Sequence, residues 1–404
     1  MSSSEPSEAL THASATARRL SGFERVWLVA GRISPPFAIQ IVVEGQGALS
    51  LERVREAARV VAEACPGSKL RLTGALGWAR WVPGGALEVV EVDGSRWDGY
   101  GPEGAPFLER PLDPRAGRAC EVLFVRGDPV RIVVRAHHAA MDGVATRTLA
   151  EELFRALRGE PCLAAAAGPL TDVEVARSLG ATIAPTRPEF ASHTGPATET
   201  PGNTWARVTV PMPPDRVMAR TIVALAEASV GEGPWRIAVP VDLRRHRDGL
   251  RSTANLTGIA HVEVGAGRAA ATVDGVAEAV AAQLRERQEA VAVLLADGVR
   301  WLPIGLMTAV GRAGMRRERA RGGFPTSGTV SNLGRGALAT FRALDFAPTA
   351  VFWVPPASPS LPLFMGMIGH EGGLELCVAA PTAFADGGRL TALLARVADR
   401  LSRA

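Results

Sequence analysis

Cysteine, tyrosine and lysine are nearly missing from this sequence of 404 residues. It contains one tyrosine, and Lys69 is its single lysine. The four cysteines lie far apart and form no CxxC pair: Cys65, Cys120, Cys162 and Cys377. This spacing predicts free thiols in a reducing cytoplasm, and it argues against a disulfide framework or a cysteine-ligated zinc site.

Long apolar runs are missing as well. No stretch of about eighteen apolar residues is present that could cross a membrane. Residues 1–17 lack the apolar core of a secretory signal, so we expect them to form a disordered leader. The eight tryptophans and twelve phenylalanines do not alternate with basic residues as single-stranded nucleic acid would require. We therefore expect a cytoplasmic protein that neither spans a membrane nor binds nucleic acid.

What is present is the composition of a globular protein. Hydrophobic residues make up 47% and charged residues 21% of the chain, and the length favours two domains or subdomains. The net charge is +4, and nearly all of the positive charge comes from arginine. A small positive excess is compatible with phosphorylated or acidic partners.

Residues 18–160 alternate between helical and strand patterns. Segment 51–65 places its apolar side chains on one helical face: Val54, Ala57, Ala58, Val61, Ala62 and Cys65. Segments 121–125 and 130–136 are β-rich runs separated by Arg-Gly-Asp-Pro, which predicts a hairpin. Segment 143–159 again has helical spacing.

Residues 161–205 are rich in proline, alanine, threonine and glycine, which indicates a linker or crossover. The alternation resumes in residues 206–404, where we expect helices at 218–230, 272–295 and 389–401 with strands between them. Two mixed α/β halves joined by a linker are therefore predicted.

Two adjacent histidines end the apolar run at 130–138. If the strand continues through both, side-chain alternation places His138 on the apolar face and His137 on the face that carries the arginines. Rings on opposite faces cannot share one metal ion. A zinc site would also need a third ligand, and neither HExxH nor CxxC is present. No metal is expected.

A helix is expected directly after the pair. Asp142 is well placed to cap it, and Gly143 allows a close approach of the backbone to a ligand. A histidine at such a junction is a good general base, because its pKa lies near neutrality and a backbone carbonyl can fix its tautomer. Without further context, however, a buried histidine that is simply hydrogen-bonded in the core is the commoner case. A serine hydrolase is not indicated, since no GxSxG segment is present.

The segment HHAAMDG at 137–143 resembles the HHxxxDG motif of a large acyltransferase superfamily. That superfamily includes chloramphenicol acetyltransferase, peptide-synthetase condensation domains, wax ester synthases and mycobacterial polyketide-associated acyltransferases. Other segments resemble the family in the expected order: RRLSGFERVWL (18–28), CPGSKLRL (65–72), PFLERPLDPRAGRACEVLFV (106–125), VPVDLRRHRDGLRSTANLTG (239–258) and SNLG (331–334). The resemblance covers the chain from about residue 18 to its end. The plant-type DFGWG motif is missing, since LDFAPTA (344–350) shares only Asp-Phe with it.

The resemblance implies two chloramphenicol-acetyltransferase-like halves with an active-site tunnel between them. It assigns His138 the role of catalytic base or of a group that positions the substrate, and His137 a supporting role. Asp142 would be structural and would pair with an arginine, for which Arg244 is the candidate. Gly143 would leave room for the thioester arm of the donor.

A hydrogen-bond donor to the developing oxyanion is also needed. Asn332, Thr253 and Asn255 are candidates, although each can equally be part of a turn or a strand end. The arginine-rich run 315–324 could contact a carrier protein or CoA phosphates, and a solvated loop is the simpler interpretation.

Together these features predict a stand-alone, monomeric acyltransferase or condensation enzyme. It would transfer an acyl group from acyl-CoA or a phosphopantetheinyl carrier protein to an alcohol or amine, in natural-product or lipid biosynthesis, with no bound cofactor. Two alternatives stay open. One is a cyclase or isomerase that uses His138 as a base without acyl transfer, and the other is a non-catalytic module that binds carrier proteins.

Overall fold

The computed structural model describes residues 17–166, 168, 170–181, 190–211, 215–231, 233–265, 271–358 and 360–403. The expected leader (1–17) lies outside the described residues except for its last member. Within the expected linker, residues 167, 169 and 182–189 also lie outside them.

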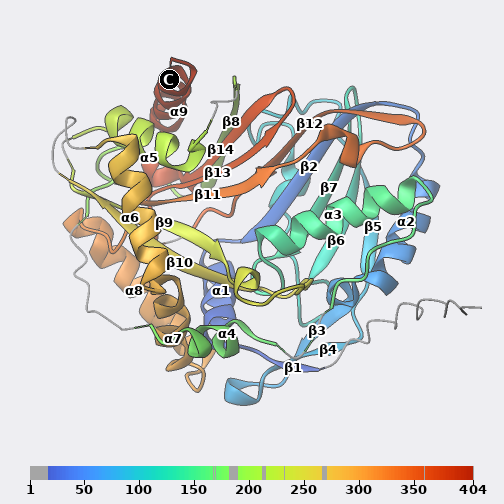
Figure 1. Ribbon diagram of the computed structural model, residues 1–404, viewed down its shortest axis with the longest axis horizontal. Helices are drawn as coiled ribbons and strands as arrows, with labels where there is room; N and C mark the ends of the chain where they lie inside the picture. Colours follow the sequence, from blue (N-terminus) through green and yellow to red (C-terminus); the bar gives the residue numbers. More distant parts are fainter. Residues whose placement is uncertain are drawn as a thin grey trace, which may run out of the picture.

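A five-stranded sheet in the order β12-β2-β7-β6-β5 forms the first half of the molecule (Figure 1). Its strands are β2 (Ala38–Gly47), β5 (Leu87–Asp93), β6 (Cys120–Arg126), β7 (Val130–His137) and β12 (Phe346–Val354). The expected hairpin is confirmed, because β6 and β7 pair antiparallel. β12 comes from the second half of the sequence and pairs with β2. A division of the chain at 161–205 therefore leaves out one strand of the first sheet.

A six-stranded mixed sheet in the order β10-β9-β11-β13-β14-β8 forms the second half. Its strands are β8 (Asn203–Val210), β9 (Trp235–Asp242), β10 (Thr257–Val264), β11 (Gly328–Arg335), β13 (Phe364–His370) and β14 (Gly373–Pro381). β11 runs parallel to both of its neighbours. A small third sheet contains β1 (Arg18–Arg19), β3 (Leu70–Thr73) and β4 (Arg80–Pro83).

Helices cover both sheets and fill the space between them. They are α1 (Gly22–Ile33), α2 (Leu51–Ala64), α3 (Gly143–Leu157), α4 (Asp172–Leu179), α5 (Val217–Ala228), α6 (Val273–Arg285), α7 (Val291–Asp297), α8 (Ile304–Arg321) and α9 (Arg389–Ser402). Figure 1 shows α2 and α3 on the first sheet and α5, α6 and α9 beside the second, with α1 between the two halves. The apolar face predicted for 51–65 is buried in α2. The two-halved α/β architecture is therefore confirmed.

One expected helix is broken in two. The segment 272–295 was expected to be continuous, but α6 ends at Arg285 and α7 begins at Val291. Arg287 between them has a φ of 58°, in the left-handed region that non-glycine residues rarely adopt. Apolar spacing alone does not reveal such a break, because neither glycine nor proline marks it.

A chain of buried charges joins the halves. Arg207 of β8 contacts Glu44 of β2 at 2.9 Å and Glu375 of β14 at 2.7 Å. Glu44 also pairs with Arg131 of β7 at 2.7 Å. Because a buried charge without a partner is costly, these pairs require the two halves to keep one relative position.

Two further properties concern the described part of the chain. None of its helices combines the length and the apolar character that a membrane crossing requires. Its four cysteines are free thiols, and three of them are buried.

Candidate active site

The histidine pair lies in a tight turn between β7 and α3. β7 ends at His137, and the amides of Ala140 and Met141 donate to the His137 carbonyl oxygen. The strand therefore does not continue through His138, and the simple alternation expected from the sequence stops one residue early. Both rings instead approach α1. His138 stacks on Trp27. His137 lies against Gly31, where a β-carbon would be only 3.0 Å from His137 Nε2.

His138 is held by two aromatic rings. The indole of Trp27 is parallel to the imidazole, with centroids 4.7 Å apart and planes 5° apart. The Phe37 ring lies 5.7 Å from it at 22°, and the Phe37 carbonyl oxygen accepts a hydrogen bond from the His138 amide. Phe37 has a φ of 34°, rare for a residue with a side chain. The ring of His138 is thus fixed from two directions.

Two groups lie 3.4 Å from Nδ1 of His138. The Met141 carbonyl oxygen can accept a proton from Nδ1, and the Asn255 side-chain amide can donate to an unprotonated Nδ1. Nε2 has no hydrogen-bond partner among the described residues. Burial lowers the pKa of His138, and Asp142 opposes this by a smaller amount. A neutral ring with a free Nε2 lone pair is the form that can accept a proton.

His137 differs from its neighbour. Its Nδ1 accepts a hydrogen bond from the Ala139 amide at 3.1 Å. Burial, with a smaller contribution from His138, lowers its pKa to about 4. No group of three histidine, cysteine or carboxylate side chains in the described ranges is arranged to hold a metal ion.

Asp142 caps α3 and pairs with Arg244. Its Oδ1 accepts the Ala145 amide at 2.8 Å, as expected for an N-cap residue. Its Oδ2 accepts Arg244 Nη1 at 3.0 Å and the Leu256 amide at 2.7 Å. The arginine named from the sequence is therefore in contact with this aspartate.

Arg244 organises the loop before β10. Its Nε donates to the Ser252 carbonyl oxygen at 2.9 Å and its Nη2 to that of Ala254 at 2.6 Å. This brings Asn255 against the histidine turn, where its side-chain amide donates to the His138 carbonyl oxygen. Although burial lowers the pKa of the Arg244 guanidinium, the carboxylates of Asp142 and Asp242 raise it above its ordinary value.

A cavity of about 190 Å³ lies between the two halves beside His138. Gly143 lines it, and a β-carbon there would lie 2.7 Å from Leu333 Cδ2, so an added methyl group would displace the end of the Leu333 side chain. Asn332 also lines it, with its Oδ1 accepting the Gly334 amide at 2.8 Å. Neither of the other two oxyanion candidates, Thr253 and Asn255, is among the lining residues.

Thr253 lies elsewhere for a steric reason. It is buried against the turn after α2, where a β-carbon on Gly67 would lie only 2.1 Å from Thr253 Oγ1. Its hydroxyl lies 3.4 Å from the Ala166 carbonyl oxygen. Its contacts are therefore those of a packing residue.

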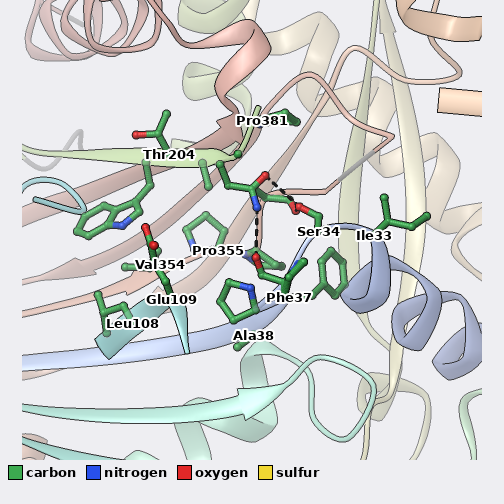
Figure 2. Close-up of a pocket in the computed structure, with 18 of the residues that line it drawn as sticks. Ile33, Ser34, Phe37, Ala38, Leu108, Glu109, Thr204, Val354, Pro355 and Pro381 are labelled. Atoms are coloured by element: carbon green, nitrogen blue, oxygen red, sulfur yellow. Dashed lines mark hydrogen bonds between the residues drawn. The ribbon is translucent and has the colours of Figure 1, made fainter. Parts of the chain in front are cut away.

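A larger cavity of about 540 Å³ lies on the other side of Phe37, which lines both. Figure 2 shows Ser34, Phe37 and Pro355 among the residues that line it, with Pro381 at the top of the view. The Ser34 hydroxyl donates to Asn203 Oδ1 at 2.9 Å across this cavity.

The arginine-rich run 315–324 is mostly helix. Residues 315–321 form the last two turns of α8, so the expectation of a solvated loop is wrong for this part. Arg319 and Met315 of this helix line the larger cavity. The run therefore borders the larger cavity.

The sequence did not reveal several residues that shape the site. Trp27 and Phe37 belong to segments about 100 residues before His138, and His261 lines the same cavity from β10. No local pattern marks Phe37. For Trp27, the sequence offers one signal, its position on an amphipathic helix. This signal indicates only that the side chain faces the interior.

No protein-family model and no curated protein matches this sequence. Solved structures match it over nearly its whole length. The starter condensation domain of rhizomide synthetase has a TM-score of 0.66 at 14% identity, covering 96% of this chain and 94% of that chain. The epimerization domain from the third module of tyrocidine synthetase B has a TM-score of 0.61 at 11% identity, with 98% of each chain covered. Polyketide synthase associated protein 5 from Mycobacterium tuberculosis has a TM-score of 0.57 at 15% identity, with 97% and 99% covered. These likenesses confirm the fold that the HHxxxDG resemblance implied.

Proposed function

We propose that this protein transfers an acyl group from a thioester to an alcohol or amine, with His138 as general base. The observation that carries the proposal is the free Nε2 of a neutral, buried imidazole that lines a cavity between the two halves. Removing the proton of the nucleophile during its attack on the thioester avoids a cationic adduct, which is typically worth roughly 10² to 10⁴ in rate.

The surroundings of His138 support this role. A proton on Nδ1 could be donated to the Met141 carbonyl oxygen, which would leave the free lone pair on Nε2. Asn332 is at the edge of the same cavity, and its Oδ1 accepts the Gly334 amide, so its Nδ2 is the group that would donate to an oxyanion if its side chain turns toward the cavity. Asp142 and Arg244 would act indirectly by holding the histidine turn in place, and His137 would help to hold the same turn.

Acyl-CoA or an acyl carrier protein would supply the thioester as a separate co-substrate, with no other cofactor. The neighbour from rhizomide synthetase was solved with C8-CoA and Leu-SNAC, a donor and an acceptor together. In this protein, the cavity of about 540 Å³ beside α8 is large enough for an extended arm, and Arg319 at its edge suits a phosphate of the donor. We place this activity in natural-product biosynthesis and take the monomer as its working form.

The test is thiol release from a panel of acyl-CoAs and acyl carrier proteins, with alcohols and amines as acceptors. His138→Ala should lower transfer by about 10² to 10⁴ while its circular dichroism stays that of the wild type. His246→Gln is the matched control: it changes a histidine that binds Glu289 at 3.0 Å, away from the cavity, and should keep full activity. Full transfer by His138→Ala would contradict the proposal.

One observation favours a second candidate. An epimerization domain has the same fold, so His138 could instead move a proton to and from a carbon atom without acyl transfer. In that case a thioester would exchange its α-hydrogen with deuterated solvent, and no thiol would be released.

A further inference from the structure

Polar side chains without protein partners line one wall of the His138 cavity. On β11, Val330 packs in the core of the second half, so its neighbours Thr329 and Ser331 face the opposite way, into the cavity. They are 4% and 7% exposed. Neither hydroxyl makes a hydrogen bond within the described part of the chain.

The next strands continue this wall. On β10, Val262 is in the same core, which directs His261 into the cavity. His261 and Thr329 are both register partners of Ala238 on β9, the strand between them. Adjacent strands lie about 4.8 Å apart, so the backbones of His261 and Thr329 are about 10 Å apart. Only the methyl group of Ala238 lies between them, which makes a hollow with a polar group on each side.

Two loops add further hydroxyl groups. Thr326 and Ser358 line the cavity, are 6% and 7% exposed, and make no side-chain hydrogen bond to a described residue. Buried polar groups nearly always have a partner, so these hydroxyls are available to a ligand or to water in the cavity. Burial, followed by the nearby Arg236, lowers the pKa of His261 to about 4. Its ring is therefore neutral near pH 7 and offers one donor and one acceptor.

Aromatic rings also line the cavity. Trp27, Phe37 and Trp353 belong to α1 and the first half, and Phe364 lies beside Thr329 on β13; flat apolar groups favour a planar or cyclic ligand. Among the described residues, Asp242 is the one charged residue that lines the cavity, and it is already paired with Arg244. An anionic group would thus meet no cation there, and burying it would be costly.

The volume limits the size of the ligand. An engineered apolar cavity of about 150 Å³ in another protein admits benzene, and this cavity measures about 190 Å³. It has room for one substituted six-membered ring and not for a long alkyl chain.

We propose that this cavity recognises an uncharged, ring-sized substrate group that carries at least two hydroxyl or carbonyl oxygens. The apolar face of the ring lies against the partly exposed Trp27, and its oxygens bind across Ala238 between His261 and Thr329. This inference rests on the proposed function, for which it names the substrate class at the site.

Three fragments of nearly equal size test the inference by calorimetric titration into the full chain. Catechol carries two hydroxyls, o-xylene replaces them by methyl groups, and benzoate carries a charge. Catechol should bind about tenfold more tightly than o-xylene, since two net hydrogen bonds are worth at least that factor. Benzoate should bind most weakly.

Variants locate the binding. Thr329→Val with Ser331→Ala should weaken catechol about tenfold and leave o-xylene unchanged, and Ala238→Leu should block both by filling the hollow. Thr221→Val is the matched control: this threonine is fully buried on α5, outside the cavity, and its replacement should change neither affinity.

The inference is overturned if o-xylene or benzoate binds as tightly as catechol, if no fragment binds, or if the double variant retains catechol affinity. Because titration needs no turnover, its result is separate from that of the acyl-transfer assay. Catechol binding with no thiol release would overturn the proposed function alone.

Discussion

Two carboxylates on one guanidinium allow a sharp test of what holds the histidine turn. Arg244 Nη1 lies 3.0 Å from Asp142 Oδ2 and 2.8 Å from Asp242 Oδ1. The distances are nearly equal, but the Asp142 side chain is 3% exposed and that of Asp242 is 35% exposed. If burial decides the strength of the pair, the two aspartates should differ greatly in their contribution to stability.

Replacement by asparagine keeps the shape of each side chain. Asn caps a helix about as well as Asp, so Asp142→Asn leaves the contact with the Ala145 amide intact. It places an uncharged amide where Leu256 and Arg244 both donate. Breaking a buried pair costs about 3–5 kcal/mol. We expect about 3 kcal/mol because Asp242 still compensates part of the charge.

Asp242→Asn should cost about 1 kcal/mol or less, since solvent screens an exposed pair. Urea unfolding followed by tryptophan fluorescence measures both values. In a double-mutant cycle, Asp142→Asn and Arg244→Met should show a coupling of at least about 1.5 kcal/mol. Equal costs for the two aspartates, or additive effects at Asp142 and Arg244, would refute the reasoning.

Three further predictions concern pH and packing. Because burial lowers the pKa of His138, the acidic limb of kcat/KM for acyl transfer should lie below the ordinary histidine value of about 6.5; a limb above it would contradict a buried neutral base. Burial lowers the pKa of His193 to about 3. As the pH falls through about 6.5, this histidine is therefore protonated in the unfolded chain but stays neutral in the folded protein. His193 should contribute a fall of about 2 kcal/mol in the free energy of unfolding between pH 6.5 and 5, besides the falls from His137 and His261. His193→Phe, which can still stack on Trp235, should lessen the total fall by that amount in urea titrations at each pH. Gly143→Ala should lower acyl transfer because its methyl group contacts Leu333. Adding Leu333→Ala to this variant should restore the transfer rate. If the rate does not recover, the loss comes from a changed backbone and not from this contact.

Local patterns were sufficient for the elements that carry the base. The spacing of apolar residues in 51–65 is that of α2, and the turn at 137–143 follows from a strand followed by an N-cap aspartate. Each of these signals lies within about fifteen residues. The contact of Asp142 with Arg244, 102 positions away, was expected only through the family resemblance.

Pairings between distant segments carry no such local signal. Nothing in the sequence of β12 indicates that it joins the first sheet, because its apolar run would suit either sheet equally. The same holds for the row formed by His261, Ala238 and Thr329, which depends on the register of three strands. A shift of one residue would turn each of these side chains to the other face of the sheet.

The inner face of the second sheet carries the polar residues that the proposed recognition would use. Thr329 and Ser331 are polar and buried on the cavity wall, where an apolar side chain of similar size would leave no hydroxyl that needs a partner. Polar side chains at positions where an apolar residue would suit the fold are found mostly at functional sites. Under the proposed function, the first half would supply the base, at the end of β7. The second half would supply recognition, from positions that only strand register brings together.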